Sequence, residues 1–132
     1  MGTDIHTHIE VKIKGREEWL HYSAPEVQRN YTIFGLMSDI GRDLGVRPIV
    51  PPRGLPADLS VITRACWEAD SKHFWPHGAS WLGVKDLRVL RNRLKGILGP
   101  DFDWLKHDLL RFALTDVRAP FADLRIVFWF DC

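Results

Sequence analysis

The chain has only two cysteines in 132 residues, Cys66 and Cys132, and neither belongs to a C-x-x-C pair. Two isolated cysteines cannot form the disulfide framework of a small secreted domain, so we expect a reducing, cytoplasmic environment. The sequence also lacks an apolar run of the ~18 residues that a membrane helix needs, and it does not begin with a basic region followed by an apolar stretch. We therefore expect a soluble, unprocessed protein that does not bind membranes.

An excess of one charge is also missing, because 18 lysines and arginines face 17 aspartates and glutamates. A net charge of +1 gives no overall attraction to nucleic acids or membrane surfaces, so any such binding must depend on a local patch. Repeats, low-complexity tracts and flexible linkers are absent as well. The length of 132 residues is typical of one domain, and we expect a single domain over residues 1–132.

Both ends of the chain predict β-strands. Residues 4–13 alternate polar and apolar side chains, and the short apolar and aromatic run from Trp19 to Tyr22 follows a polar stretch with Gly15, which predicts a β-hairpin. Residues 124–131 are rich in β-branched and aromatic side chains and nearly apolar, which is typical of a buried central strand.

About four helices are expected between these strands. Apolar periodicity and capping residues predict helices over 31–44 with Gly45 as its stop, from Val61 after a cap at Ser60 or Asp58, over 84–98, and from Trp104 after a cap at Asp101 or Asp103. The four prolines of 47–56 predict an ordered surface loop, and 71–81 is expected to be irregular. The fold class is therefore α+β, with a small sheet in which the terminal strands pair.

The first strand carries the clearest chemical pattern. Its period of two places Asp4, His6, His8 and Glu10 on one face and apolar residues on the other. Two neutral imidazoles on alternate residues can bind a divalent metal such as zinc or manganese, with Glu10 as a third ligand or an acid/base group. The alternative is that these side chains form the solvated face of an amphipathic strand.

The segment Asp-Ile-His-Thr-His at residues 4–8 resembles the opening strand of the amidohydrolase and PHP metal-dependent hydrolases. That resemblance implies that His6 and His8 are metal ligands. The folds of those families are barrels of roughly 200 residues or more, and this chain is too short to hold one.

Two further segments are candidates for an anion site. Arg29, Asn30 and Tyr31 stand where a helix begins, and Arg53 lies in the proline-rich loop. Arginine can grip a phosphate or carboxylate with two parallel hydrogen bonds, so these residues could hold an anionic ligand together. The alternative is that Asn30 caps the helix and Arg53 anchors its own loop.

The irregular segment adds aromatic and titratable side chains. His77 is a candidate for proton transfer, and Ser80 and Trp81 could contact a nucleotide-like ligand, because aromatic faces beside polar groups suit stacking on a base or sugar. A Ser80–His77 nucleophile pair lacks a Gly-x-Ser-x-Gly elbow and an assignable acid. Packing of Trp81 in the core is the remaining alternative.

The helix expected over 84–98 has five basic residues against one acidic residue. Arg88, Arg91 and Lys95 share one face, so they could bind nucleic acid or an acidic protein surface, or could simply be the solvated side of the helix.

Most of the chain resembles small proteins of unknown function from bacteriophages and prophages, through its Asp-Ile-His opening, Arg-Asn-Tyr, Arg-Gly-Leu-Pro, Ser-Trp-Leu and Val-Phe-Trp-Phe-Asp segments. The resemblance implies a bacterial host cytoplasm, and it carries no known activity with it. Two hypotheses follow. In the first, the polar residues meet in one cleft, which binds a nucleotide-like or other anionic ligand and could hydrolyse it with a divalent metal. In the second, the protein catalyses no reaction and binds a host macromolecule, such as a defence protein.

Overall fold

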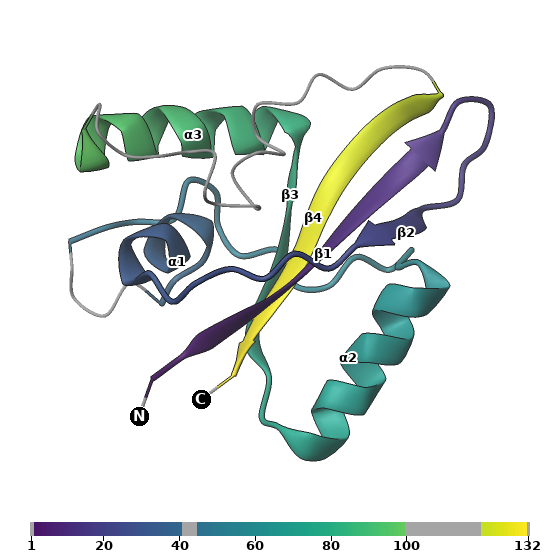
Figure 1. Cartoon of the computed structure of the whole chain (residues 1–132), viewed down its shortest axis with the longest axis horizontal. Coiled ribbons are helices and arrows are strands. Elements are labelled where there is room, and N and C mark those ends of the chain that lie inside the picture. Colours follow the sequence, from purple (N-terminus) through teal and green to yellow (C-terminus); the bar gives the residue numbers. More distant parts are fainter. Residues whose placement is uncertain (1, 41–44, 100–119, 132) are drawn as a thin grey trace.

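The computed structural model describes residues 2–40, 45–99 and 120–131, and in them it shows one antiparallel sheet of four strands with three helices (Figure 1). The strand order is β2-β1-β4-β3. The elements are β1 (Asp4–Ile13), β2 (Leu20–Ser23), α1 (Tyr31–Met37), α2 (Val61–His73), β3 (His77–Gly83), α3 (Val84–Leu98) and β4 (Phe121–Asp131). The α+β class expected from the sequence is confirmed.

The two terminal strands form the centre of the sheet, as the sequence predicted. β1 and β4 pair over nearly their whole length, from Asp4 opposite Asp131 to Ile13 opposite Phe121. β2 extends β1 as the predicted hairpin, and β3 lies on the other side of β4. Because opposed residues in an antiparallel pair point to the same side, this register decides which side chains of β1 and β4 meet.

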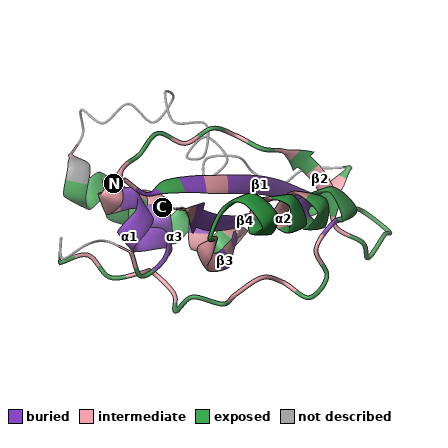
Figure 2. Ribbon diagram, turned by 90° about the horizontal axis from the view of Figure 1, so that it is seen from below, coloured by how far each residue is buried: buried purple, intermediate pink, exposed green. Residues whose placement is uncertain are grey.

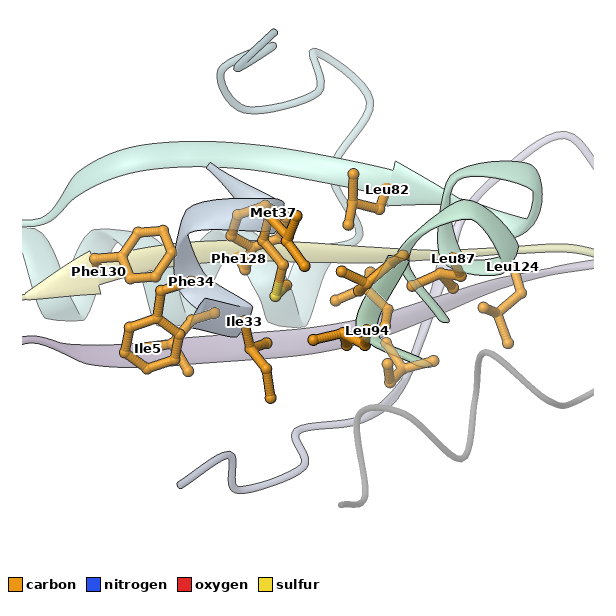
Figure 3. Close-up of a cluster of buried hydrophobic side chains, with 14 of the residues drawn as sticks. Ile5, Ile33, Phe34, Met37, Leu82, Leu87, Leu94, Leu124, Phe128 and Phe130 are labelled. Carbon is orange, nitrogen blue, oxygen red and sulfur yellow. The ribbon is translucent and has the colours of Figure 1, made fainter. Parts of the chain in front are cut away.

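One side of the sheet, here called the core face, holds the hydrophobic core. Ile9, Ile126 and Phe128 project from the central strands, and α1 and α3 cover them with apolar side chains (Figure 3). Leu87, Leu90 and Leu94 recur at helical spacing on α3, and all three are almost completely buried. The helix predicted over 84–98 is therefore confirmed, and its apolar stripe is buried in the middle, whereas Ile97 at its end is 51% exposed.

The opposite side, here called the polar face, carries His6, His8 and Glu10 from β1 and is partly covered by α2. α2 is poorly buried along its length, as Figure 2 shows, and Thr63 is its only fully buried residue. The alternative of a solvated face is wrong for two of its four β1 residues, because His8 is 6% exposed and Glu10 is 0% exposed. The polar face is instead a second buried layer made of paired polar groups.

Helix α1 is shorter than predicted. It ends at Met37 rather than at residue 44, because Ser38 adopts an extended conformation, while its backbone N–H still donates to the Phe34 carbonyl and closes the last turn. The Ser38 hydroxyl then donates to the Gly78 carbonyl on β3. The helix thus ends where the chain contacts a strand distant in the sequence, and the last residues of the predicted helix, 41–44, lie outside the described part.

The prediction of an irregular segment over 71–81 is also wrong. α2 continues to His73, and β3 begins at His77. β3 contains two glycines and few strand-forming residues, so its pattern did not suggest a strand. It forms because it pairs with β4, which is strongly strand-forming and has a free side there.

The helix predicted near Trp104 lies outside the described residues. Across the described ranges, no helix combines the length and the apolar character that a membrane crossing requires.

Candidate functional site

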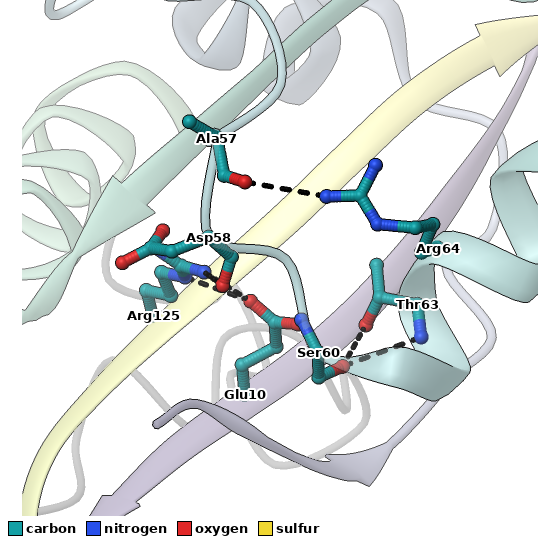
Figure 4. A network of polar contacts seen from close by, with 7 residues as sticks. All are labelled: Glu10, Ala57, Asp58, Ser60, Thr63, Arg64 and Arg125. Atoms are coloured by element: carbon teal, nitrogen blue, oxygen red, sulfur yellow. Dashed lines mark hydrogen bonds and ion pairs between the residues drawn. The ribbon is translucent and has the colours of Figure 1, made fainter. Parts of the chain in front are cut away.

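The centre of the polar face is an ion pair between Glu10 and Arg125, which stand opposite each other on β1 and β4 (Figure 4). The Arg125 Nε–H donates to Glu10 Oε1 at 2.7 Å, and the Ser60 backbone N–H donates to Glu10 Oε2 at 2.8 Å. Arg125 also binds the Asp58 side chain and carbonyl, and its guanidinium lies 4.1 Å from the centroid of the Trp19 ring. This network holds the N-terminus of α2 against the sheet.

These contacts leave Glu10 ionised. Burial alone would raise the pKa of Glu10, but hydrogen bonds from Ser60 and Arg125 outweigh it and hold that pKa below its usual value. The expected role of Glu10 as an acid/base group stays a prediction. In this structure its two carboxylate oxygens are occupied by the protein's own donors.

His6 lies between two carboxylates at the other end of the polar face. Its Nε2 is 2.5 Å from Asp131 Oδ2, and its Nδ1 is 3.7 Å from Asp70 Oδ2. The buried Trp129 donates its indole N–H to the same Asp70 oxygen at 2.9 Å. Asp131 therefore fixes the orientation of the imidazole, while the Nδ1 side faces Asp70 at a distance beyond a direct hydrogen bond.

His8 is hydrogen-bonded to a second histidine. Its Nδ1 is 3.1 Å from His21 Nε2 on β2, and its ring stacks on Trp129 with centroids 4.8 Å apart. Burial and the neighbouring His21 lower the pKa of His8 to about 4, and burial also lowers the pKa of His21. Both imidazoles are neutral at pH 7, so one ring donates and the other accepts.

The metal prediction depended on His6, His8 and Glu10 converging. In the structure each faces a different partner, and the described residues include no group of three or more histidine, cysteine, aspartate or glutamate side chains placed to hold a metal ion. Zinc or manganese binding therefore stays a prediction. The His6 side chain is 31% exposed, with Asp131 bound to Nε2 and the Asp70 carboxylate 3.7 Å from Nδ1.

The two residues predicted for proton transfer are far apart. His77 pairs with Phe130 and Glu10 pairs with Arg125, which are five residues apart on β4. At about 3.4 Å per residue this separation is roughly 17 Å, too far for both to act on one bond in this conformation. His77 Nδ1 lies 3.4 Å from the Trp75 carbonyl.

The Arg-Asn-Tyr segment mainly fixes the N-terminal part of the fold. Asn30 is the N-cap of α1 and accepts from the Ile33 N–H, as the capping alternative predicted. Arg29 binds the Asp4 carboxylate through Nε and Nη2, and the Tyr31 hydroxyl accepts from the Thr3 N–H. These residues lie at the N-terminal end of β1, away from Arg53.

By contrast, the structure brings three of the predicted ligand residues together. The backbone N–H of Arg53 donates to the Ser80 hydroxyl at 3.0 Å, and its guanidinium stacks 4.2 Å from the centroid of Trp81. Arg53 Nη1 also donates to the Trp81 carbonyl at 2.9 Å and to Asp86 at 2.8 Å. The proline-rich loop is thereby fixed across β3, and the arginine is fixed in one orientation.

This cluster borders an open groove of about 740 Å³ where β3 passes into α3, here called the junction groove. Arg53, Lys85 and Arg88 line it together with Asp86 and Asp123. Asp86 is already engaged, because it binds Arg53 and accepts from the Gly83 N–H at the start of α3. The groove therefore presents cationic side chains from a loop and a helix that are far apart in the sequence.

The basic residues of α3 continue from this groove along the helix. Arg88 and Lys95 are exposed, and Arg91 is half-buried, with an Nε that has no hydrogen-bond partner among the described residues. Arg88 belongs both to the groove and to the stripe of Arg88, Arg91 and Lys95. The face predicted from helical spacing is thus joined to the junction groove.

Sequence reasoning missed Arg125, His21, Asp70 and Asp131. Arg125 carried a signal, because a charged residue inside an otherwise apolar central strand requires a buried partner. The other three come from segments whose position relative to β1 depends on the tertiary fold.

Searches against models of protein families, against curated proteins and against solved structures each found no match to this chain. The site is therefore interpreted from its geometry.

Proposed function

We propose that the protein binds a phosphate-bearing ligand, such as a nucleotide, in the junction groove. The observation that supports this proposal is the convergence of Arg53, Lys85 and Arg88 around one open groove of about 740 Å³. A groove of this size suits a nucleotide-sized molecule, and arginine and lysine are the side chains that bind phosphate best.

The position of Arg53 favours this role over a purely structural one. An arginine that has already been ordered by stacking on Trp81 and by pairing with Asp86 loses little further entropy when an anion binds. Its side chain is still 29% exposed, so part of the guanidinium remains accessible.

Hydrolysis is not part of this proposal. The carboxylates that line the groove, Asp86 and Asp123, lie with cationic side chains, and the histidines of the polar face belong to a different part of the molecule. Binding is the function that the geometry supports best.

Thermal-shift measurements with ADP and with adenosine test the proposal. ADP should raise the melting temperature and adenosine should not, because only ADP carries phosphates; at a ligand concentration of 100 Kd the stabilisation is about 2.7 kcal/mol. Lys85→Ala should reduce the ADP shift, whereas Arg64→Ala, which removes an exposed arginine on α2, should leave it unchanged. Equal shifts for wild type and Lys85→Ala, or an adenosine shift as large as that of ADP, would refute the proposal.

A second candidate is supported by the charge distribution of α3. Five of the chain's 18 basic residues lie on this helix, while its one acid, Asp86, is paired with Arg53. This segregation favours binding of an elongated polyanion, a nucleic acid strand, along Arg88, Arg91 and Lys95. If the protein acts by binding a host macromolecule without catalysis, this basic side of α3 is the surface that would bind it.

Salt dependence distinguishes the two candidates. Binding of a fluorescent single-stranded oligonucleotide along α3 should weaken steeply with salt, and Lys95→Ala should lower the slope of log K against log[salt] by about 0.7. Lys95 does not line the junction groove, so Lys95→Ala should not change ADP binding. An unchanged slope for Lys95→Ala would rule out the strand-binding candidate and leave the groove proposal intact.

A further inference from the structure

The junction groove continues into a row of cationic side chains on α3, here called the basic row. Its members are Lys85, Arg88 and Lys95, which are exposed, and Arg91, which is half-buried. An α-helix turns by about 100° per residue, so these side chains lie within about one third of its circumference. Asp86, the one acid of this helix, lies outside that third. The basic row is therefore a continuous cationic side of the helix.

The basic row extends from the groove in one direction. Lys85 and Arg88 line the groove, and Arg91 and Lys95 follow on later turns of the helix. Lys85 and Lys95 are separated by about 15 Å along the helix axis. That length corresponds to roughly four nucleotides of one strand, at about 3.4 Å each. In Figure 1, α3 leads away from β3 and from the start of β4, so the row leaves the groove on that side.

Positive charge is more concentrated in the groove than along the row. Arg53 reaches the groove from the proline-rich loop, and Lys85 and Arg88 reach it from the first turns of α3. Arg53 Nη1 is occupied by the Trp81 carbonyl and Asp86, whereas its Nη2 has only a 3.4 Å contact with Asp86 among the described residues. A phosphate monoester carries a charge of about −1.5 to −2 at pH 7. An internal phosphodiester carries a single charge, so the groove suits a monoester and the row suits phosphodiesters.

A carboxylate on β4 opposes a polyanion that would continue through the groove. Asp123 lies near the start of β4 and belongs to the lining. Its Oδ1 accepts from the Leu124 N–H, which is a neutral donor. Lys12 stands opposite Asp123 on β1, but its ammonium lies over the Trp19 ring. A strand leaving toward β4 would meet a negative charge, whereas one that follows α3 meets cations.

We infer that the junction groove holds the terminal phosphate of a nucleic acid strand and that the next few nucleotides follow the basic row. This inference rests on the proposed function, because the terminal phosphate occupies the groove in which phosphate binding is proposed. Arg53 and Lys85 bind the monoester, and Arg91 and Lys95 contact the phosphodiesters that follow. Since these are backbone contacts, binding does not depend on the base sequence.

The test compares three short oligothymidine strands by fluorescence anisotropy, each labelled at its centre. One has a 5′-phosphate, one has a 3′-phosphate and one has hydroxyls at both ends. At least one phosphorylated strand should bind about tenfold more tightly than the unphosphorylated strand, because it adds a doubly charged group to a cationic groove. The strand that binds more tightly identifies the end that the groove takes. Equal binding of all three strands would overturn the inference.

Variants locate the terminal phosphate. Lys85→Ala should lower the affinity for the phosphorylated strand to near that for the unphosphorylated one, whereas Lys95→Ala should weaken the binding of all three strands alike. Arg93→Ala is the matched control, because Arg93 is an exposed arginine on the same helix but points about 200° away from Lys95. It should change neither affinity. A preference for the phosphorylated strand that persists in Lys85→Ala would overturn the inference.

Asp123→Asn tests the direction of the strand. Removing this charge should strengthen the binding of the unphosphorylated strand, because an internal phosphodiester can then pass through the groove. No change in that affinity would contradict a strand end in the groove.

ADP separates this inference from the proposed function. Saturating ADP should remove the advantage of the phosphorylated strand and leave the binding of the unphosphorylated strand along α3. An ADP thermal shift without any preference for a phosphorylated strand would overturn strand-end binding and leave phosphate binding intact, whereas absence of the ADP shift would overturn both. Displacement of the strands by polyglutamate as effective as that by unlabelled oligothymidine of equal charge would indicate an acidic protein as the partner and would also overturn the inference.

Discussion

Removal of one partner of the Glu10–Arg125 pair should destabilise the protein more than any surface substitution. Glu10 is 0% exposed and Arg125 is 4% exposed, so neither charge can be solvated by water if its partner is lost. Breaking a buried ion pair costs about 3–5 kcal/mol for this reason. A domain of this size has a total stability of roughly 5–15 kcal/mol, so Glu10→Gln should unfold at a much lower urea concentration.

The assay is urea unfolding followed by tryptophan fluorescence, since the chain has six tryptophans. Glu10→Gln and Arg125→Met should each lose about 3 kcal/mol or more, whereas the double variant Glu10→Leu/Arg125→Met should recover much of that loss, because it leaves no unpaired buried charge. Glu18→Gln is the matched control: it breaks the contact with Arg16, but both side chains are more than 60% exposed, and no measurable change is expected.

The pH dependence gives an independent check on the same pair. The pKa of Glu10 is lower in the folded state than in the unfolded state, so its contribution to stability is present above the unfolded pKa, about 4.3, and is lost as the pH falls through the folded pKa. Glu10→Gln should therefore flatten the loss of stability in acid. A cost of less than about 1 kcal/mol for Glu10→Gln at pH 7, or a loss of stability in acid equal to that of wild type, would show that the buried pair does not stabilise the fold in this way.

Three further predictions concern other parts of the fold. Because burial and the neighbouring His21 lower the pKa of His8 to about 4, the unfolded state binds more protons between pH 6.5 and 4. The free energy of unfolding should therefore decrease by up to about 1.4 kcal/mol for each pH unit as the pH falls through this range; His8→Gln should reduce this slope, and equal slopes would show that the fold does not keep His8 neutral. Gly78→Ala should destabilise by more than about 1 kcal/mol in urea unfolding, because a Cβ there would lie 3.0 Å from an aromatic ring of β4, whereas Gly54→Ala, also at positive φ but in open space, should cost less. Ser60→Ala removes the N-cap of α2 and should cost about 1 kcal/mol, measured by the same unfolding curve, and a shift below a few tenths would show that the cap contributes nothing.

Local sequence patterns determined the elements whose signals are strong. The alternation over 4–13 and the β-branched and aromatic run at 124–131 each predicted a strand that the structure contains, and the periodicity of 84–98 with Gly99 after it predicted α3 with its correct ends. The capping role of Asn30 and of Ser60 was also predictable, since a cap is satisfied by a backbone N–H three residues away. In each cap the accepting side chain and the donating N–H are three residues apart, so a short stretch of sequence already contains both partners.

The tertiary structure decided the ends of α1, the existence of β3 and the partner of each polar group. Helix α1 ends at Ser38, which bonds to a residue 40 positions later in the sequence. β3 has few strand-forming residues, and it pairs because β4 lies beside it. The same holds for the site. The alternation put His6, His8 and Glu10 on one face, but it could not show that the register of β4 sets Arg125 opposite Glu10, or that β2 brings His21 to His8.

The alternation in the sequence therefore determined which side of β1 is polar, and the tertiary fold determined which contacts the polar side chains make. A solvated strand, a metal site and a buried ion pair all begin with the same alternation, because period two specifies only direction. Which of them forms depends on long-range contacts that bring β4, β2 and α2 against β1. Arg53 illustrates the same division, since its chemistry was evident from its residue type, whereas its place beside Lys85 and Arg88 required the fold.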